Sequence, residues 1–469
     1  MNKTKVIATI SPAISSKEMI KSLIINGVDV IRLNMSYASP EFCREVVEKV
    51  NDINKELNTH IATMLDLKGP LIRIGRIANN QAFLKNNDKI RICMNNILGD
   101  STKFSIDYPN LINEIPVNSI IKINDGLVEL QILEKGYDYL LCKVLKEGII
   151  TSNTKINIKN IKLNKPFLNE EDKRIIKFAH ELDIDFLSLS YARSYEDVLE
   201  VNDLLINLDD DNIQIITKIE NEQAILDIDN IIKVSDGIMI SRNTLSSEVS
   251  LEKIPGIQKK IINKCHEAGI INIVTSDLFT TMNFMNPAKA EVSDIANSVI
   301  DGVDAVLLSG ANNISNPIET LKILERVINV AEKDLDYNKY MDKVKTVELK
   351  DITTSIAYSV VNSSNALNCK AIITPTISGY TAKKISKLRP ICPIVAVSPN
   401  IKTVKSLSLN FGVIPILIDD LKSMDAIIEK SKKIVKILLA LEDKEIIIIT
   451  GGYPFKKVKH TNFMKVEEI

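Results

Sequence analysis

Charged side chains in this sequence follow directly after several strand-like apolar runs. If those runs are parallel strands of one barrel, their carboxyl ends meet at the rim where such barrels carry their active sites. Carboxylates bind hard divalent cations, and arginine and lysine neutralise the charge of a transferring phosphoryl group. The rim therefore predicts a phosphorylated substrate handled with a metal ion. The segments are Arg32-Leu33-Asn34-Met35-Ser36, Asp66-Leu67-Lys68-Gly69-Pro70-Leu71-Ile72-Arg73, Ser190-Tyr191-Ala192-Arg193, Lys218-Ile219-Glu220-Asn221, Ser241-Arg242-Asn243-Thr244 and Thr275-Ser276-Asp277.

A simpler interpretation stays open for each of these residues taken alone. A charged residue at a strand end is more often a salt-bridge partner or a solvated side chain. Arg242 and Asp294 could tie loops together by hydrogen bonds instead of binding a substrate. The site is favoured because charged residues recur at the same end of several strands.

The elements that must position these residues alternate regularly along the chain. Buried parallel strands read as continuous apolar runs, and helices make the crossovers between them. The pattern predicts a (β/α)₈ TIM barrel. Strands are expected at 6–10, 30–33, 61–65, 186–189, 213–219, 237–240, 271–274 and 305–308, and helices at 17–25, 40–57, 170–181, 195–205, 222–232, 255–268, 291–300 and 317–333.

The alternation breaks twice and thereby indicates two further domains. Residues 71–164 show short alternating runs and the turn pair Asp125-Gly126, which predict a small all-β barrel inserted as a lid over the catalytic face. Residues 343–469 carry strand patterns at 371–373, 394–397, 413–418 and 445–449, which predict an open α/β domain. The TIM barrel itself takes residues 1–70 and 165–342.

Composition excludes several other classes. The 469 residues are 45% hydrophobic and 25% charged with a net charge of −1, which is typical of a globular protein and leaves no basic field for nucleic acid. No apolar run approaches the roughly 20 residues of a membrane helix, and no secretory signal is expected. The six cysteines form no CxxC pair and only four histidines occur, so we expect neither disulfides nor a zinc site, and a cytoplasmic location.

Several motifs, in order along the whole chain, resemble blocks of the pyruvate kinase family. The resemblance implies a barrel, a lid and a regulatory C-terminal domain, usually in a homotetramer. It also implies phosphoryl transfer from phosphoenolpyruvate to ADP in glycolysis, giving pyruvate and ATP with Mg²⁺ (or Mn²⁺) and K⁺. Besides the segments at 32–36, 66–73 and 218–221, the motifs are Thr4-Lys5-Val6-Ile7-Ala8-Thr9-Ile10-Ser11-Pro12-Ala13, Ser235-Asp236-Gly237-Ile238-Met239 and Ala290-Glu291-Val292-Ser293-Asp294-Ile295-Ala296-Asn297.

The same resemblance implies catalytic and substrate-binding roles at matching positions. Lys218 would stabilise the charge of the transferring phosphoryl group. Ser276, where the family has threonine, would be catalytic and touch the substrate near its protonated face. Arg32 would bind the substrate phosphate, and the backbone N–H groups of Asn243 and Thr244 would bind its carboxylate.

Nucleotide and metal roles are implied in the same way. Glu220 would bind Mg²⁺. Nucleotide contacts would come from Asn34, Ser36 and Arg73, and the potassium ligands would be Asn34, Ser36, Asp66 and the backbone oxygen of Leu67.

The chain also departs from the family's pattern, which keeps other hypotheses open. Thr244 stands where the family has a second metal-binding aspartate, a loss worth about 3 kcal/mol or two powers of ten in rate; Asp277, in place of a glutamine, could substitute for it. Glu171 replaces a lysine that helps hold nucleotide phosphate. One alternative is a catalytically impaired paralogue that acts as a metabolite-binding or regulatory subunit; another is a barrel enzyme for a related phospho- or oxo-acid. Further departures are Tyr37, Ala38, Leu71, Lys289 and Ala311.

The segment from Thr374 to Thr381 resembles the family's loop for phosphorylated sugar effectors. Small hydroxyl residues and Gly379 would expose backbone N–H groups to a phosphate. An ordinary strand-to-helix turn with a Ser or Thr cap is the equal alternative. The later loop at 451–460 is basic and leaves the effector's identity open.

Overall fold

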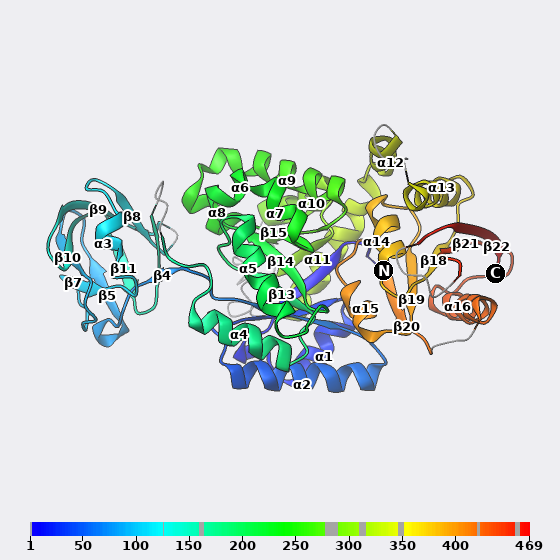
Figure 1. Cartoon of the computed structure of the whole chain (residues 1–469), viewed down its shortest axis with the longest axis horizontal. Helices are drawn as coiled ribbons and strands as arrows, with labels where there is room; N and C mark the ends of the chain where they lie inside the picture. Colours follow the sequence, from blue (N-terminus) through cyan, green and yellow to red (C-terminus); the bar gives the residue numbers. More distant parts are fainter. Residues whose placement is uncertain are drawn as a thin grey trace.

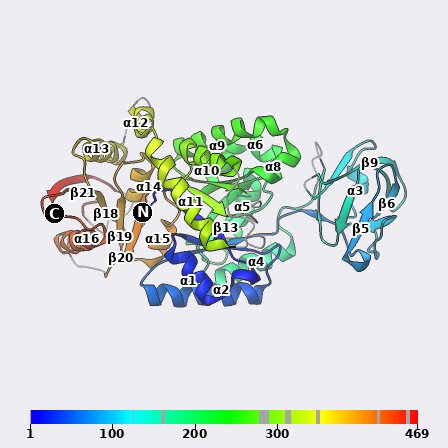
Figure 2. The ribbon, with the colours of Figure 1, turned by 180° about the vertical axis from the view of Figure 1, so that it is seen from behind.

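The computed structural model describes residues 2–124, 126–158, 164–276, 289–308, 316–345, 351–419, 423–454 and 460–469. Three structural units follow one another in space along the long axis of the molecule (Figure 1). A β-rich unit lies at one end, a barrel with surrounding helices lies in the middle, and a second α/β unit lies at the other end. The view from behind shows the same order (Figure 2).

The central unit is a closed parallel barrel with the strand order β1-β17-β16-β15-β14-β13-β3-β2. The predicted TIM barrel is therefore confirmed. All four residues of β13 and all six of β14 are buried, as expected for parallel strands that are covered on both faces. The barrel strands are β1 (Lys5–Thr9), β2 (Val30–Asn34), β3 (Ala62–Asp66), β13 (Phe186–Leu189), β14 (Gln214–Ile219), β15 (Gly237–Ser241), β16 (Ile271–Ser276) and β17 (Ala305–Leu308).

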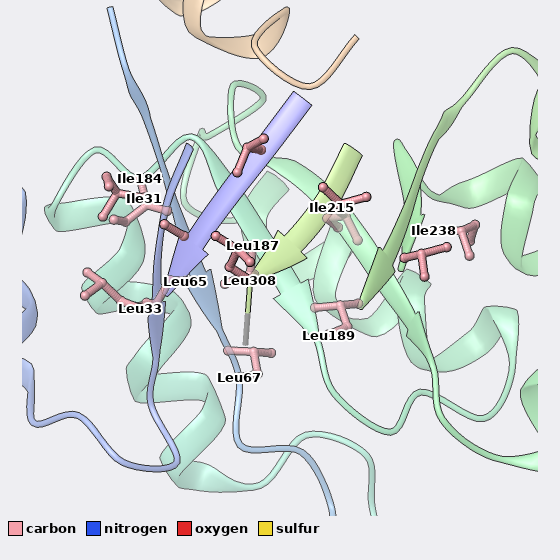
Figure 3. Close-up of a cluster of buried hydrophobic side chains, with 14 of the residues drawn as sticks. Ile31, Leu33, Leu65, Leu67, Ile184, Leu187, Leu189, Ile215, Ile238 and Leu308 are labelled. Carbon is pink, nitrogen blue, oxygen red and sulfur yellow. The ribbon is translucent and has the colours of Figure 1, made fainter. Parts of the chain in front are cut away.

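Amphipathic helices cover the outer face of the barrel and bury one continuous apolar layer. Figure 3 shows members of that layer, including Ile31, Leu65 and Leu187, on successive strands. None of the described helices combines the length and the apolar character that crossing a membrane requires. The helices around the barrel are α1 (Lys17–Ile25), α2 (Pro40–Leu57), α4 (Glu170–Glu181), α5 (Tyr195–Ile206), α6 (Glu222–Leu226), α7 (Ile228–Val234), α8 (Arg242–Glu248), α9 (Ile254–Ala268), α10 (Lys289–Asp301) and α11 (Pro317–Ala331).

The single helix predicted at 222–232 is wrong, because the chain forms α6 and α7 with a break at Asp227. The Asp227 carboxylate accepts hydrogen bonds from the backbone N–H of Tyr195 at 2.8 Å and from Asn230 Nδ2 at 2.8 Å. Aspartate competes in this way with helical hydrogen bonding. An apolar 3.6-residue period does not reveal such a break.

The lid unit leaves the barrel after β3 and returns before α4. Its larger sheet has the order β4-β12-β8-β9-β10-β6-β7, and β11 pairs with β5. The hairpin predicted around residues 125 and 126 is present as antiparallel β8 and β9, although Asp125 itself lies outside the described residues. Its elements are β4 (Ile72–Arg73), β5 (Gln81–Leu84), β6 (Lys89–Cys93), β7 (Lys103–Ser105), α3 (Leu111–Glu114), β8 (Ile120–Ile123), β9 (Val128–Lys135), β10 (Tyr139–Lys146), β11 (Gly148–Thr151) and β12 (Lys155–Ile158).

The C-terminal unit is an α/β sheet with the order β20-β19-β18-β21-β22. The four predicted strands are present and pair in parallel, but the prediction missed β22, which pairs antiparallel with β21 at the sheet edge. Its half-exposed, charge-rich sequence lacks the continuous apolar run of a buried strand. The elements are α12 (Tyr337–Lys345), α13 (Ile352–Ala366), β18 (Ala371–Pro375), α14 (Tyr380–Lys387), β19 (Ile394–Ser398), α15 (Ile401–Ser406), β20 (Val413–Leu417), α16 (Met424–Leu438), β21 (Ile446–Gly451) and β22 (Phe463–Glu468).

Candidate active site

A polar chamber of about 660 Å³ lies where the carboxyl ends of the barrel strands face the lid. Four of the charged residues singled out in the sequence, Lys68, Arg73, Lys218 and Glu220, line its wall. The lid contributes a polar turn at 151–155 that sequence reasoning missed; its run of small polar residues between β11 and β12 was the available signal. The lining residues are Asn34, Ser36, Tyr37, Lys68, Leu71, Arg73, Asn124, Thr151, Ser152, Asn153, Thr154, Lys155, Ser190, Tyr191, Lys218, Glu220 and Thr244.

Lys218 is the buried cation of this chamber. It comes near the end of β14, and its side chain is only 9% exposed. Its Nζ lies 3.1 Å from Ser190 Oγ, 3.1 Å from Glu220 Oε1 and 3.4 Å from Asp66 Oδ2. These partners hold the ammonium group at one place, which is what a cation must have to meet charge that develops on a substrate.

Arg32 and Asp66 form a second buried pair, from neighbouring strands β2 and β3. Arg32 Nε donates to Asp66 Oδ1 at 3.0 Å, and Arg32 Nη2 lies 2.5 Å from Asp66 Oδ2. Arg32 Nη1 also donates to Thr9 Oγ1 at 2.8 Å, a contact that the sequence interpretation missed. Burial alone would raise the pKa of Asp66, but the charges of Arg32 and Lys218 outweigh it and keep that pKa below its ordinary value.

Glu220 is the carboxylate best placed for a divalent cation. It is 3% exposed, and its Oε2 accepts a hydrogen bond from the backbone N–H of Tyr191 at 2.8 Å. Tyr191 adopts a positive φ of 59°, which turns that N–H toward the carboxylate. Thr244 lines the same chamber with a neutral side chain.

The donor set fits Mg²⁺ only with substrate oxygens or water completing the shell. Within the described residues no group of three or more His, Cys, Asp or Glu side chains comes together. The oxygens of Asp66 face two cations, Arg32 and Lys218, whereas Glu220 faces Lys218 alone and lines the chamber, so Glu220 is the better candidate for a metal ligand. One carboxylate with substrate phosphates is a known arrangement for this ion.

The residues expected to bind K⁺ lie together on adjacent strands. Asn34 of β2 is the register partner of Asp66 of β3. Asn34 Oδ1 accepts from the Ser36 backbone N–H at 3.0 Å. These neutral and anionic oxygens are the donors that a hard cation requires, and the carbonyl of Leu67 follows directly in the chain.

Arg73 connects the lid to the barrel. It belongs to β4, and its Nη1 donates to the backbone oxygen of Asn153 in the lid at 2.9 Å. Its Nη2 lies 3.4 Å from Ser36 Oγ on the barrel side. A phosphate in the chamber would therefore meet a cation that both units position.

Two charged pairs change how the sequence pattern should be interpreted. Both terminal nitrogens of Arg242 pair with the carboxylate of Asp294. This arginine therefore joins two segments of the barrel, as in the simpler interpretation of the sequence. Lys68 Nζ lies 2.6 Å from Glu171 Oε1, so the acidic departure at 171 pairs with a lysine of the chamber wall. The Lys68–Glu171 pair was not predicted, because it joins residues far apart in sequence.

The remaining candidates lie near α8 or outside the described side chains. Asn243 and Thr244 occupy the first turn of α8, and Ser241 before it makes no capping hydrogen bond through its side chain. Thr244 lines the chamber, whereas the Asn243 side chain lines a neighbouring pocket of about 750 Å³. The side chain of Ser276, and Asp277 and Ala311 entirely, lie outside the described residues.

Comparison with known proteins gives full-length matches. A family model described as "Pyruvate kinase, barrel domain" matches residues 1–321, and one described as "Pyruvate kinase, alpha/beta domain" matches residues 354–467. A pyruvate kinase of Clostridium perfringens is 36% identical over 474 residues, covering 100% of both chains. Pyruvate kinases of Staphylococcus saprophyticus and Staphylococcus aureus are each 35% identical over 472 residues, covering 99% of this chain and 80% of theirs.

Proposed function

Because this chain belongs to the pyruvate kinase family, we propose that it transfers the phosphoryl group of phosphoenolpyruvate to ADP, giving pyruvate and ATP in glycolysis. The observation that carries this proposal is the buried Lys218, held among Ser190, Asp66 and Glu220 on the floor of the chamber. A fixed cation in a water-poor site stabilises a phosphoryl group in transfer more than a solvated one does.

In this proposal, different cations contact the transferring phosphoryl group and the nucleotide. Lys218 and Arg32 face the phosphoryl group that moves, and Arg73 with Asn34 and Ser36 contacts the nucleotide at the lid side. The uncapped first turn of α8, with the N–H groups of Asn243 and Thr244, receives the carboxylate of the substrate. Ser276 belongs to the end of β16, on the same rim, and takes part in protonating the enolate.

Two metal ions complete the proposal. Mg²⁺ or Mn²⁺ would be held by Glu220, and K⁺ by Asn34, Ser36, Asp66 and the carbonyl of Leu67. When bound, these ions supply positive charge to the phosphate oxygens. The protein's own part is to keep Glu220 oriented through the Tyr191 N–H and to keep Asp66 ionised beside Arg32.

The catalytically impaired paralogue is not favoured. Relatives named pyruvate kinase match along essentially the whole chain. Lys218 also has its carboxylate partners Asp66 and Glu220 without any contribution from residue 244. The family match also argues against the hypothesis of a barrel enzyme that acts on a related phospho- or oxo-acid.

The wider proposals concern assembly, regulation and location. A homotetramer and a phosphorylated sugar effector follow from the family. The effector would bind the loop between β18 and α14, where Thr376 Oγ1 accepts from the Gly379 backbone N–H at 3.0 Å. Six free cysteines support the proposal of a reducing, cytoplasmic environment.

The test is pyruvate formation by the purified chain from phosphoenolpyruvate and ADP, coupled to lactate dehydrogenase, with Mg²⁺ or Mn²⁺ and K⁺. We expect a rate that requires the divalent ion and falls by about 10²-fold or more in Lys218→Ala. Lys259→Ala, at an exposed lysine on α9, is the matched control and should keep the rate. No turnover from folded protein with any metal, or full turnover in Lys218→Ala, would refute the proposal.

A further inference from the structure

A leucine of the C-terminal unit is buried inside the base of the barrel. Leu409 lies in the turn at 407–412 between α15 and β20, and it is 0% exposed. It belongs to the hydrophobic cluster that fills the barrel interior, together with Ile7, Val30, Ala62, Met64, Phe186, Ile216, Met239, Ile271, Ile273, Ala305 and Leu307. We call residues 408–412 the barrel plug; Leu407 before them is the C-cap of α15 and packs in the core of the C-terminal unit.

The barrel plug is fixed on its α15 side by a buried ion pair. Lys405 Nζ lies 3.2 Å from Oδ2 of Asp185, the residue that directly precedes β13. The same carboxylate oxygen accepts from the backbone N–H of Thr63 at the base of β3, at 2.8 Å. The ion pair therefore joins the segment preceding the plug to the entrances of two barrel strands.

The β20 side of the plug is fixed by a second buried pair. The side chain of Arg389 is 1% exposed, and its Nη2 lies 2.7 Å from Oδ1 of Asp304, the residue that precedes β17. Its guanidinium group lies 3.8 Å from the centre of the Phe411 ring. The backbone N–H of Gly412 also donates to the Lys3 carbonyl oxygen at 2.9 Å. Leu409 thus has little freedom to leave the barrel.

The cluster that Leu409 completes lies directly under the catalytic charges. Side chains two residues apart on a strand point to the same face. Met64 is therefore beneath Asp66, and Ile216 is beneath Lys218, and both lower residues belong to the cluster. Packed interiors transmit displacement because they contain few voids.

From these observations we infer that Leu409 is a positioning residue for phosphoryl transfer. It fills the base of the barrel, so that the strand residues under Lys218 and Asp66 keep one packing and the charged pair above them keeps one geometry. The inference rests on the proposed function for its kinetic consequence. Its structural consequence is that β3 and β14 are protected from opening, and this can be measured without any enzyme activity.

The experiment compares Leu409→Ala with Leu407→Ala in the full-length protein. Leu407 is equally buried but belongs to the core of the C-terminal unit, so its truncation reports general destabilisation. We expect kcat of Leu409→Ala to fall on the order of 10-fold to 100-fold, with KM for phosphoenolpyruvate within about twofold. Leu409→Met, which conserves volume, should restore kcat, and Leu407→Ala should keep it.

Hydrogen exchange measured by mass spectrometry gives a readout that needs no turnover. Peptides covering β3 and β14 should exchange faster in Leu409→Ala than in Leu407→Ala. Equal exchange of these strands in the two variants would overturn the inference even if the wild type had no activity. Equal kcat losses in the two alanine variants, or a wild-type kcat in Leu409→Ala, would overturn it in an active enzyme.

Discussion

At the scale of single residues, the site depends on charges that are buried and paired with one another. Arg32, Asp66, Lys218 and Glu220 are each at most 9% exposed by residue or side chain. Buried ions are costly unless each has a partner, and here cations and carboxylates alternate around the chamber floor. Thr244 departs from this pattern, because it lines the same chamber as Glu220 with a neutral hydroxyl.

Thr244→Asp should strengthen divalent-ion binding. A second carboxylate on the chamber wall adds charge to the one that Glu220 supplies, so the Mg²⁺ concentration for half-maximal rate should fall by about tenfold or more. Thr244→Asn is the control, since it has nearly the same shape as aspartate and no charge. The measurement is the reaction rate as a function of Mg²⁺ concentration. An equal change of the half-maximal Mg²⁺ concentration in the two variants would show that charge is not the cause.

Asp66→Asn should destabilise the protein in a pH-dependent way. Because the folded-state pKa of Asp66 is lowered from 3.8, its ionised form contributes stability above that value and loses it as pH falls through the folded pKa. Removing the charge leaves the buried Arg32 without its carboxylate partner and leaves Lys218 with Glu220 as its remaining anionic partner, which costs about 3–5 kcal/mol near neutral pH.

The difference between wild type and Asp66→Asn should therefore be constant from pH 7 to about pH 4.5 and shrink below about pH 4. Urea denaturation followed by circular dichroism across this range measures it. Asp211→Asn, at an exposed carboxylate, should show neither effect. A difference that grows toward acid would mean that Asp66 is not ionised in the fold.

At the scale of elements, the joint between β3 and the lid sets the floor of the chamber. Gly69 has a φ of +73°, and a Cβ there would lie 2.4 Å from the backbone oxygen of Ser190. Ser190 in turn contacts Lys218 Nζ at 3.1 Å. The close approach of the two backbones therefore explains why glycine stands between the strand end and the lid.

Gly69→Ala should reduce the free energy of unfolding by about 1–3 kcal/mol, because it adds strain at a positive φ and a clash with a carbonyl. It should also lower kcat by displacing Ser190. Gly256→Ala is the matched control, since no atom lies within 4 Å of its added Cβ and α9 gains about 0.5–1 kcal/mol from alanine. Thermal unfolding and steady-state kinetics of both variants test this, and equal behaviour would contradict it.

At the scale of the whole molecule, the barrel shares its chamber with the lid and its interior with the C-terminal unit. The lid provides the roof of the chamber through Arg73 and residues 151–155, and the C-terminal unit closes the base of the barrel through Leu409. Both views of the ribbon show the lid and the C-terminal unit at opposite ends of the barrel (Figures 1 and 2).

The cysteines should report the compactness of all three units. Burial raises the pKa of Cys43 and Cys142 to about 12 and that of Cys392 to about 11, so these thiols are protonated and shielded. Cys93, on β6 of the lid, is the partly exposed cysteine.

Iodoacetamide at pH 8 should therefore label Cys93 well before the other five, and all six after denaturation. Peptide mapping by mass spectrometry identifies the labelled sites, and Cys93→Ser should remove the fast phase. Rapid labelling of Cys265, which lies in the barrel's helical layer, would show that this layer opens in the native state.

The sequence by itself determined the barrel, the approximate bounds of its strands and of most of its helices, and the types of residue at its rim. Helices at 17–25, 40–57 and 170–181 were predicted at their observed bounds, because each begins at a capping Ser or Asn and carries a regular apolar face. Strands such as 186–189 were equally clear, since buried parallel strands are continuous apolar runs.

Only the tertiary structure decided which charges pair and what fills the base of the barrel. The pairs Lys68–Glu171, Arg242–Asp294 and Arg389–Asp304 join residues about 50 to 100 positions apart. The burial of Leu409 depends on how the C-terminal unit docks. Local patterns contain the preferences of a segment for helix or strand, whereas an ion pair or a shared core depends on where the folded chain brings distant segments together.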